Sequence, residues 1–483
     1  MTPSPSAQGG PQHAAAPPDR AALEALLEPF GQQHVLAFWD ALNSPERIQL
    51  AAQIQSIDLA RVDRLFHGKH ETHDWPALAR RAVGPPAVRL SGEGQLFSPA
   101  EACQRGEQAL RDGRVGVALV AGGQGTRLGF EHPKGMYPVG PVSSASLFQI
   151  LIEKVIAAGR RYGVRVPLYL MTSSATHQET IDFLQAYANF GLAAEDLQIF
   201  CQGAMPAVDA QSGKLLLAGP AELCLSPDGH GGMLSALRAS GILNDLRRRG
   251  IEQLFYMQVD NPLATVCDTE FIGAHLLSGS ELSTQVVAKR TPTDRMGNVV
   301  SIDDRVQIIE YSDLPEAAAR QRLADGSLKL WAGSIAVHVF DVDLVERMSG
   351  DDEHSLPFHQ ALKKVPCLDA GGRKVEPDAP NAVKFEQFIF DLLPSARHSI
   401  VVEVDEARCF APLKNEPGAE RDSPQSVQAQ MIALHAEWLR QAGAELLDGV
   451  PVEISPLFAL DAAEAASKVK PGLRITEPTY FSS

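Results

Sequence analysis

The sequence predicts an α/β protein built on a mostly parallel sheet, with a helical region before it and a smaller domain after it. Two observations carry this prediction. Short apolar runs alternate with amphipathic helical patterns between residues 114 and 260, and strand-rich segments follow up to about residue 339. Alternating strands and helices form right-handed βαβ units, whose parallel strands are covered on both faces. At 483 residues the chain is also too long for one ordinary core.

The chain divides into four predicted regions. Residues 1–19, rich in Pro, Ala, Gly and Ser, are expected to be a disordered tail and lack the pattern of a secretory signal. Residues 20–100 form a helical region, in which Ser44 is expected as an N-cap before Pro45. This region ends in a loop that reaches about residue 95. The sheet core spans 101–398, and a helix over 426–442 with short strands indicates a C-terminal domain over 399–483.

Each element of the core follows from a local pattern. The apolar run VGVALVA (115–121) is short and bounded by glycine, which is typical of a buried central strand. Further strands are predicted at VPLYLMTSS, LQIFCQ and LFYMQVDN, and helices over 147–159, 176–190 and 232–249. The strand-like segments TQVVAKR, NVVSID and VQIIEYS are expected to extend the same domain.

Composition excludes several classes of protein. The net charge of −16 argues against a general nucleic-acid binder, because phosphate-backbone affinity requires a basic face. The run Arg247-Arg248-Arg249 lies on a predicted helix and is expected to be a solvated face. No apolar run approaches the roughly 18 residues of a membrane helix, and six scattered cysteines fit a reducing cytoplasm.

A glycine-rich segment follows the first core strand. In ALVAGGQGTRLGFEHPKGM, Gly122, Gly123 and Gly125 remove the Cβ atoms that would keep a phosphate away from the backbone amides. Successive amides that point into one concavity bind an anion, and Arg127 and Lys134 add full positive charges. The segment therefore predicts a triphosphate site.

Two better-known glycine motifs fit this segment less well. A P-loop requires Ser or Thr after its Lys, whereas Gly135 and Met136 follow Lys134. A dinucleotide-binding loop of the form GxGxxG opens directly into a helix. Here Leu128 occupies the third glycine position, and the next helix starts about 25 residues after the strand.

The segment GGQGTRLG…PKGM resembles the characteristic loop of UTP-dependent sugar-1-phosphate nucleotidyltransferases. The closest resemblance is to the eukaryotic-type UDP-N-acetylhexosamine pyrophosphorylases, within the wider UDP-sugar pyrophosphorylase family. It extends over nearly the whole chain, through GQQHVLAFWDAL, FCQGAMPA, SPDGHGGMLSAL, QVDNPL, IEYSDL, PNAVKFEQFIFDLL, FAPLKN and VEISPL. The resemblance implies a Rossmann-like core that transfers uridylyl from UTP to a sugar 1-phosphate, with Mg²⁺ bridging phosphate oxygens.

The resemblance also assigns roles to individual residues. Arg127, Lys134 and Lys414 would act on the triphosphate and the leaving diphosphate, with Lys414 coming from the C-terminal domain. Asp260, at the end of the strand FYMQVDN, would hold Mg²⁺ or the ribose region. The remaining nucleotide-binding candidates are Val120, Ala121, Gly122, Gly123, Gly125, Thr126, Gln202, Gly229 and Lys384. The candidates for the sugar are His230, Glu310, Tyr311 and Ser334.

Two positions depart from the pattern of the family. The N-acetylhexosamine enzymes usually have DGNGG where this chain has His230 in DGHGG, a residue shared with UDP-glucose and broad UDP-sugar pyrophosphorylases. Ser334 stands in WAGSI, where an asparagine is usual. N-acetylglucosamine 1-phosphate is the expected substrate, and glucose 1-phosphate is the alternative.

Other interpretations stay open. Asp260 could cap a turn, Gln202 could be an ordinary polar group at a strand end, and Lys384 and Lys414 could be solvated surface lysines. Glu310 and Tyr311 could form an edge-strand pair. A nucleotide-sugar glycosyltransferase is one alternative, but it would need a DxD motif, and Asp303-Asp304 is only an adjacent pair on a probable turn. A catalytically silent protein that binds a nucleotide sugar is another. His67, His70 and His73 suggest zinc, but no carboxylate or thiolate framework accompanies them and the local pattern is that of a loop. The sequence leaves the oligomeric state open, a monomer included.

Overall fold

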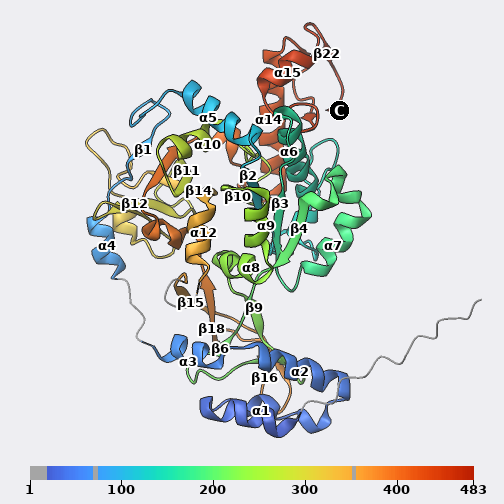
Figure 1. Cartoon of the computed structure of the whole chain (residues 1–483), viewed down its shortest axis with the longest axis vertical. Coiled ribbons are helices and arrows are strands. Elements are labelled where there is room, and N and C mark those ends of the chain that lie inside the picture. The colour runs from blue at the N-terminus through green and yellow to red at the C-terminus, as the bar shows by residue number, and fades with distance from the viewer. Residues whose placement is uncertain (1–18, 69–73, 351–354, 483) are drawn as a thin grey trace, which may run out of the picture. The chain divides into compact units, whose positions relative to one another are not determined.

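The central sheet of the computed structural model has the predicted alternation of strands and helices. Eight strands lie in the order β1-β19-β11-β14-β10-β2-β3-β4, and the hairpin β12–β13 extends the sheet from β14. Every pair along this path is parallel except those of β14, which runs antiparallel to both β10 and β11. The prediction of a mostly parallel sheet is therefore confirmed (Figure 1). The strands are β1 (Ala87–Val88), β2 (Val115–Val120), β3 (Leu168–Thr172), β4 (Leu197–Cys201), β10 (Gln253–Gln258), β11 (Leu282–Ala288), β12 (Asn298–Ile302), β13 (Arg305–Ile309), β14 (Ala332–Asp341) and β19 (Ser399–Glu403).

The structure describes residues 19–68, 74–350 and 355–482, which form two compact units. The first unit contains the described residues of Met1–Glu71, Met205–Ser226 and His359–Phe385. The second contains those of Thr72–Ala204, Pro227–Phe358 and Glu386–Ser483, including the whole central sheet. The fourfold division expected from the sequence stays a prediction. Among the described residues, no helix has the length and apolarity needed to cross a membrane.

Helices cover both faces of the sheet in the second unit. On one face, alternate residues of β2 (Val115, Val117, Leu119) pack with α5, α6, α10 and α14, and on the other Ala118 packs in the cluster of α8, α9 and α12. Buried side chains on both faces explain why β2 is an unbroken apolar run. The helices are α5 (Pro99–Arg111), α6 (Leu147–Tyr162), α7 (His177–Ala186), α8 (Met233–Ala239), α9 (Ile242–Arg249), α10 (Thr269–Leu277), α12 (Val342–Met348) and α14 (Pro424–Gln441).

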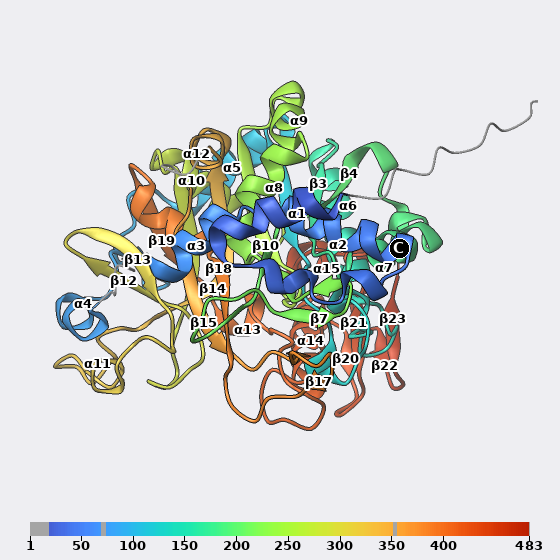
Figure 2. The ribbon, with the colours of Figure 1, turned by 90° about the horizontal axis from the view of Figure 1, so that it is seen from below.

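Shorter elements complete the second unit. Figure 2 shows α4 (Trp75–Arg81) beside the hairpin β12–β13, where Ala79 and Ala82 pack with Val300 and Ile302. The loop predicted up to about residue 95 therefore contains a helix and the edge strand β1, so this prediction is wrong in part. The remaining helices are α11 (Glu316–Ala319), α13 (Glu406–Cys409) and α15 (Ala462–Lys468). Two small parallel pairs, β20 (Glu445–Leu446) with β22 (Arg474–Ile475) and β21 (Val452–Ile454) with β23 (Thr479–Phe481), lie near the end of the chain.

The first unit joins the N-terminal helices to two later segments. Gln32 donates to the carbonyl oxygen of Gly213 at 3.1 Å and accepts from the amide of Leu215 at 2.9 Å. The elements are α1 (Arg20–Leu27), α2 (Ser44–Ser56) and α3 (Leu59–His67), together with the strands β6 (Val208–Asp209), β7 (Leu217–Gly219), β8 (Glu222–Leu223), β16 (Cys367–Leu368) and β17 (Lys374–Val375). β15 (Phe358–Lys363) and β18 (Ala382–Gln387) lie at the ends of the third segment, and β5 (Ala204–Pro206) and β9 (Leu225–Pro227) at those of the second.

Two helix predictions fail for local reasons. The helix expected over 232–249 is two helices, because Gly241 adopts a left-handed φ of 75° between α8 and α9. Within the N-terminal region expected to be helical, residues 33–36 and 39–41 form 3₁₀ turns instead, and the N-cap of α2 is Asn43 rather than Ser44. Asn43 accepts from the amide of Glu46, whose carboxylate accepts from the Asn43 amide in return.

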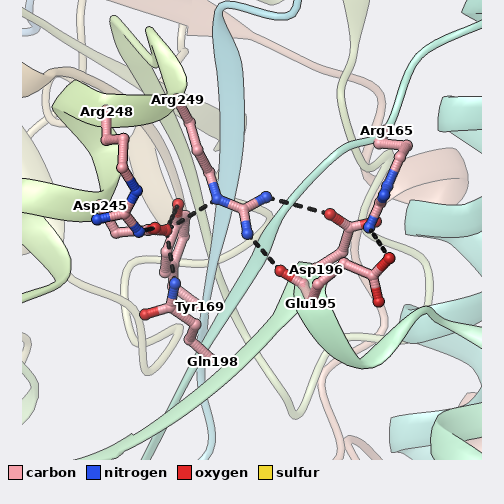
Figure 3. A network of polar contacts seen from close by, with 8 residues as sticks. All are labelled: Arg165, Tyr169, Glu195, Asp196, Gln198, Asp245, Arg248 and Arg249. Atoms are coloured by element: carbon pink, nitrogen blue, oxygen red, sulfur yellow. Dashed lines mark hydrogen bonds and ion pairs between the residues drawn. The ribbon is translucent and has the colours of Figure 1, made fainter.

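The basic run on α9 is neutralised by carboxylates, as Figure 3 shows for Arg248 and Arg249. Arg249 pairs with Asp245 at 2.9 Å and with Asp196 at 3.1 Å, and the Asp245 carboxylate also accepts from the Tyr169 hydroxyl. This network lies at the amino ends of β3 and β4. Arg247 pairs with Asp343 and Glu346 on α12. Arg247 and Arg248 are exposed, as expected of a solvated face, whereas Arg249 is half-buried between two carboxylates.

Candidate active site

The glycine-rich segment after β2 is a loop whose backbone bonds to itself. The amide of Lys134 donates to the carbonyl oxygen of Gly123 at 3.0 Å, and the amide of Gly125 donates to that of His132 at 2.8 Å. Two short 3₁₀ turns, Thr126–Leu128 and Lys134–Met136, lie within the loop. These bonds bring Lys134 back beside the glycines that precede it by about ten residues.

Glycine is needed at two positions of this loop for different structural reasons. A Cβ on Gly125 would lie 2.7 Å from the carbonyl oxygen of Phe130, so this position must be bare for the loop to close. A Cβ on Gly123 would meet nothing within 4 Å. Because Gly123 lines a pocket, its missing side chain leaves room for a ligand rather than for the protein.

The pocket of about 270 Å³ lies at the carboxyl ends of β2 and β10, where ligands of open α/β sheets bind. It gathers predicted residues from four separate loops. The lining residues are Val120, Gly122, Gly123, Lys134, Gln202, Pro227, Gly229, His230, Gln258, Val259 and Asp260. Predicted nucleotide, metal and sugar residues are thus brought together in one cavity.

Charge in this pocket is concentrated around Lys134. Burial lowers the pKa of its ammonium, Asp260 raises it, and the neighbouring cations Lys414 and Arg127 lower it further. The Lys134 Nζ donates to the carbonyl oxygen of Leu413 at 3.3 Å, and the amide of Leu413 donates to that of Asp260 at 2.8 Å. Lys134 and Asp260 line the pocket, and Lys414 and Arg127 lie near Lys134, so the positive charge around it favours a polyanionic ligand.

Lys414 extends this cluster from the segment before α14. Its amide donates to the carbonyl oxygen of Asp422 at 2.8 Å, and its ammonium lies 5.9 Å from the ring centre of Phe410. Burial raises the pKa of the Asp422 carboxyl, and the charge of Lys414 opposes that shift. Asp422 was not predicted. It lies eight residues beyond Lys414, and only the folded loop brings the two together.

Gln202 and Gly229 line the pocket from the loops after β4 and β9. Gln202 is 8% exposed, and its side-chain oxygen would lie 3.0 Å from a Cβ on Gly122. Gly229 has a φ of 89°, and a Cβ there would lie 2.3 Å from the carbonyl oxygen of Gln387. Glycine is therefore required at residue 229 by the protein backbone itself, whatever ligand is bound.

His230 is held in one tautomer. Its Nδ1 accepts from the amide of Ile389 at 3.1 Å, and burial lowers its pKa to about 4. The neutral ring therefore carries its hydrogen on Nε2, which makes His230 a hydrogen-bond donor. Phe388 and Phe390 lie against the ring at 5.5 and 5.7 Å between centres. These aromatic residues were missed, although their i, i+2 spacing in FEQFIFD was visible.

The other sugar candidates lie at the hairpin β12–β13 and on β14. The amide of Ser334 donates to the carbonyl oxygen of Gly297 at 2.8 Å, and a Cβ on Gly297 would lie 3.3 Å from the Glu310 carboxylate. The structure thus brings Ser334 and Glu310 together. Tyr311 is 49% exposed. Lys289, also missed, is buried beside Gly333 and donates to the side-chain oxygen of Asn298.

The remaining predicted residues are placed as follows. Ala121 and Gly125 are buried within the loop, whereas Thr126 and Arg127 are exposed on it. Lys384 is on β18 in the first unit, and its predicted contact with phosphate stays a prediction. Within the described part of the chain, no three His, Cys, Asp or Glu side chains form a metal site. His67 pairs with Asp63, and His70 and His73 lie outside the described residues.

Mg²⁺ is compatible with the donor set of the pocket. Mg²⁺ is commonly bound by one or two carboxylates, with substrate phosphates and water completing its coordination. Asp260 supplies one carboxylate beside the lysines that would hold those phosphates. The pocket therefore suits a metal ion that arrives with its nucleotide rather than one held by the protein alone.

Comparisons with known proteins agree with this geometry. Residues 84–419 match the family model described as UTP–glucose-1-phosphate uridylyltransferase. The chain is 35% identical to the UDP-N-acetylglucosamine pyrophosphorylase of Saccharomyces cerevisiae, over 91% of this chain and 95% of the relative. It is 36% identical to the human UDP-N-acetylhexosamine pyrophosphorylase-like protein 1, over 88% and 86%. The crystal structure of the Trypanosoma brucei uridine diphosphate N-acetylglucosamine pyrophosphorylase with an inhibitor superposes with a TM-score of 0.78. It covers 96% of this chain and 99% of that one at 24% identity, a likeness of fold.

Proposed function

Because the chain belongs to the UTP–glucose-1-phosphate uridylyltransferase family, we propose that it transfers uridylyl from UTP to N-acetyl-α-D-glucosamine 1-phosphate. The products are UDP-N-acetylglucosamine and diphosphate. The observation that carries the proposal is the pocket in which Lys134, Asp260 and Gln202 surround the bare backbone of Gly123. The choice of sugar rests on relatives named for N-acetylglucosamine that cover most of the chain.

The reaction needs little covalent chemistry from the protein. A phosphate oxygen of the sugar 1-phosphate attacks the α-phosphorus of UTP, and diphosphate leaves in line. The protein must hold two anions together and stabilise the charge that develops at the α-phosphate and on the leaving group. Lys134 is suited to this task because it is half-buried among other cations. The exposed Arg127 and the half-buried Lys414 would add further positive charge.

The base and the sugar would be held by neutral donors. The amide side chain of Gln202 can match one donor and one acceptor on a uracil edge. The Nε2 hydrogen of His230 can be donated to a hydroxyl or acetamide oxygen of the ligand. Bound Mg²⁺ would neutralise phosphate charge, with Asp260 as the protein ligand. We also propose that the protein is located in the cytoplasm, where its scattered cysteines would stay reduced.

A substrate panel tests the proposed function. UTP is supplied with N-acetylglucosamine, N-acetylgalactosamine or glucose 1-phosphate, and diphosphate release is followed. We expect the highest kcat/KM with N-acetylglucosamine 1-phosphate. A preference for glucose 1-phosphate would place the protein with the UDP-glucose pyrophosphorylases, as His230 alone would suggest. No diphosphate release with any of the three sugar phosphates would refute the proposed activity. Replacing UTP with ATP or GTP should abolish release if Gln202 contacts uracil.

A further inference from the structure

A second cavity lies away from the residues assigned to uridylyl transfer. It has a volume of about 230 Å³ and lies between α6, the loop after β10, α14 and the chain around residues 453–461. Its apolar lining includes Ile150, Ala158, Leu263, Met431, Leu434 and Trp438. The cavity belongs wholly to the second unit, and uridylyl transfer has no evident use for it.

Two side chains in this cavity each have an N–H group with no acceptor among the described residues. Lys154 donates to the carbonyl oxygens of Pro262 at 2.6 Å and Ala264 at 2.8 Å, which uses two of its three N–H groups. His435 is 8% exposed, and its Nδ1 accepts from the amide of Ile454 at 3.2 Å. The hydrogen of the neutral ring is therefore on Nε2. No described residue accepts it, or the third N–H of Lys154.

The other charged side chains around the cavity have partners: the two arginines form ion pairs, and three carboxylates accept hydrogen bonds from neutral donors. Arg161 pairs with Asp461 and Glu464, and Arg408 pairs with Glu437. Glu153 accepts from Gln149 and Ser455, Glu453 accepts from the amides of Val142 and Ser143, and Asp268 caps α10. Within the described chain, Lys154 has no carboxylate at ion-pair distance. Burial lowers the pKa of the nearby His435 to about 3, and the charge of Lys154 lowers it further. An unpaired cation beside a neutral donor is complementary to an anion.

We propose that this cavity binds a small organic acid, whose carboxylate accepts from Lys154 Nζ and His435 Nε2 and whose apolar body packs against Met431 and Trp438. The apolar walls favour an aromatic or branched aliphatic acid over a sugar phosphate or an inorganic anion. The nucleotide pocket, with its bare glycines around Lys134, has the opposite character.

The cavity is joined to the nucleotide pocket by short connections. The carbonyl groups held by Lys154 lie two and four residues after Asp260. Between them and Asp260, the Asn261 side chain donates to the carbonyl oxygen of Cys409 at 2.8 Å and accepts from the amide of Ala411 at 3.0 Å. An acid that draws the Lys154 ammonium toward itself would weaken the hydrogen bonds from Lys154 to Pro262 and Ala264 in this loop. Because this loop follows Asp260, a bound acid would lower kcat without competing with UTP.

Fluorine NMR on the full chain tests the site with a defined probe. 4-Fluorobenzoate should show line broadening on addition of the protein, and the neutral 4-fluorobenzamide of nearly the same shape should show much less. In Lys154→Met the affinity for 4-fluorobenzoate should fall at least about tenfold, the effect of losing one charged contact. Lys134→Met, which removes a lysine from the nucleotide pocket, should leave the broadening unchanged. This pair separates the two pockets without any substrate present, so the result does not depend on the proposed function.

Equal broadening by the acid and the amide would overturn the proposal. So would broadening by 4-fluorobenzoate that disappears in Lys134→Met but persists in Lys154→Met. A crystal soaked with 4-bromobenzoate gives an independent answer if Lys154→Met does not fold. Anomalous density for bromine beside Met431 and Trp438 is expected, and an empty cavity at saturating concentration would refute the site. In turnover assays the probe should lower kcat at saturating UTP, and relief by UTP would contradict the regulatory role.

Discussion

The ammonium of Lys134 donates to the carbonyl oxygen of Leu413, the residue directly before Lys414. The glycine-rich loop after β2 and the segment before α14 are therefore held together by one of the cations proposed to act on the triphosphate. Binding of a phosphate at Lys134 must compete with this bond or share the ammonium with it. The position of Lys414 thus depends on what occupies the nucleotide pocket.

Lys134→Met should abolish turnover while leaving the fold intact. Loss of one preorganised charge at a transferring phosphate is expected to lower kcat by about 10²- to 10³-fold. The melting temperature should change little, because the side chain has one weak hydrogen bond to the protein. Diphosphate release and thermal unfolding are measured on the same sample. Lys470→Ala, at an exposed position, is the matched control, and wild-type kcat in Lys134→Met would refute the assigned mechanism.

Gly123→Ala and Gly229→Ala should fail in different ways. A Cβ at residue 123 meets no protein atom within 4 Å, so Gly123→Ala should fold normally yet raise the KM for UTP by narrowing the pocket. A Cβ at residue 229 collides with the backbone of Gln387 at a φ of 89°. Strain and overpacking should each cost about 1–3 kcal/mol of stability. Urea unfolding and UTP titration separate the effects, and a normal KM in Gly123→Ala would place the triphosphate elsewhere.

Asp260→Asn tests the proposed protein ligand of Mg²⁺. Chelation by EDTA should stop diphosphate release in the wild type, and added Mg²⁺ should restore it. In Asp260→Asn we expect the Mg²⁺ concentration at half-maximal rate to rise by about tenfold or more, because a neutral amide binds a hard cation less well than a carboxylate. An unchanged Mg²⁺ dependence in the variant would remove Asp260 from the metal site.

His230→Asn should shift the choice of sugar. The amide oxygen of asparagine can replace Nδ1 as acceptor for Ile389, so the loop should keep its shape. The variant then has the sequence usual among the N-acetylhexosamine enzymes. We expect the ratio of kcat/KM for N-acetylglucosamine 1-phosphate over glucose 1-phosphate to rise by about tenfold, near the value of one hydrogen bond. An unchanged ratio would show that residue 230 does not determine which sugar 1-phosphate is preferred.

Buried His338 should make the protein sensitive to acid. Burial lowers its pKa from 6.5 to about 3, and its Nδ1 has no hydrogen-bond partner among the described residues. The unfolded chain binds a proton below about pH 6.5, whereas the folded protein does so only near pH 3. The free energy of unfolding therefore falls as pH decreases through this window, by about 1.4 kcal/mol per pH unit.

His338→Phe should remove this loss. Raised carboxyl pKa values, such as about 7 for Asp228 and about 6 for Asp268, act in the opposite direction but are common to both proteins. The difference in unfolding free energy between variant and wild type should therefore grow in favour of the variant as pH falls from 7 to 4. Urea unfolding at four pH values measures it, and a constant difference would contradict a neutral buried histidine.

The sequence predicted the elements that local pattern determines. The apolar runs of β2, β3 and β10 were found because strands covered on both faces need mostly apolar side chains. The antiparallel insertion of β14 between β10 and β11 could not be found, because strand order depends on pairing between distant segments. Gly241 was missed as a helix break because the apolar pattern continues on both sides of it.

The site residues that follow directly from strand ends were also predictable, whereas those placed by tertiary packing were not. Gly123 and Asp260 follow strands whose carboxyl ends meet at one edge, so their convergence follows from the fold. Lys134 joins them because its loop folds back onto Gly123. Phe390, Lys289 and Asp422 could not be assigned, since each depends on a loop whose path is set by tertiary packing. His230 was recognised as unusual, but its fixed tautomer required the amide of Ile389.

The pairing of β1 with β19 joins Ala87 to Val401 in the same parallel ladder. During synthesis, one edge of the sheet must therefore wait until more than four-fifths of the polypeptide has left the ribosome. Contacts so distant along the chain make folding slow and leave unpaired strand edges exposed in the meantime. Shortened nascent chains that end before residue 399 should consequently be clients of chaperones rather than native-like intermediates.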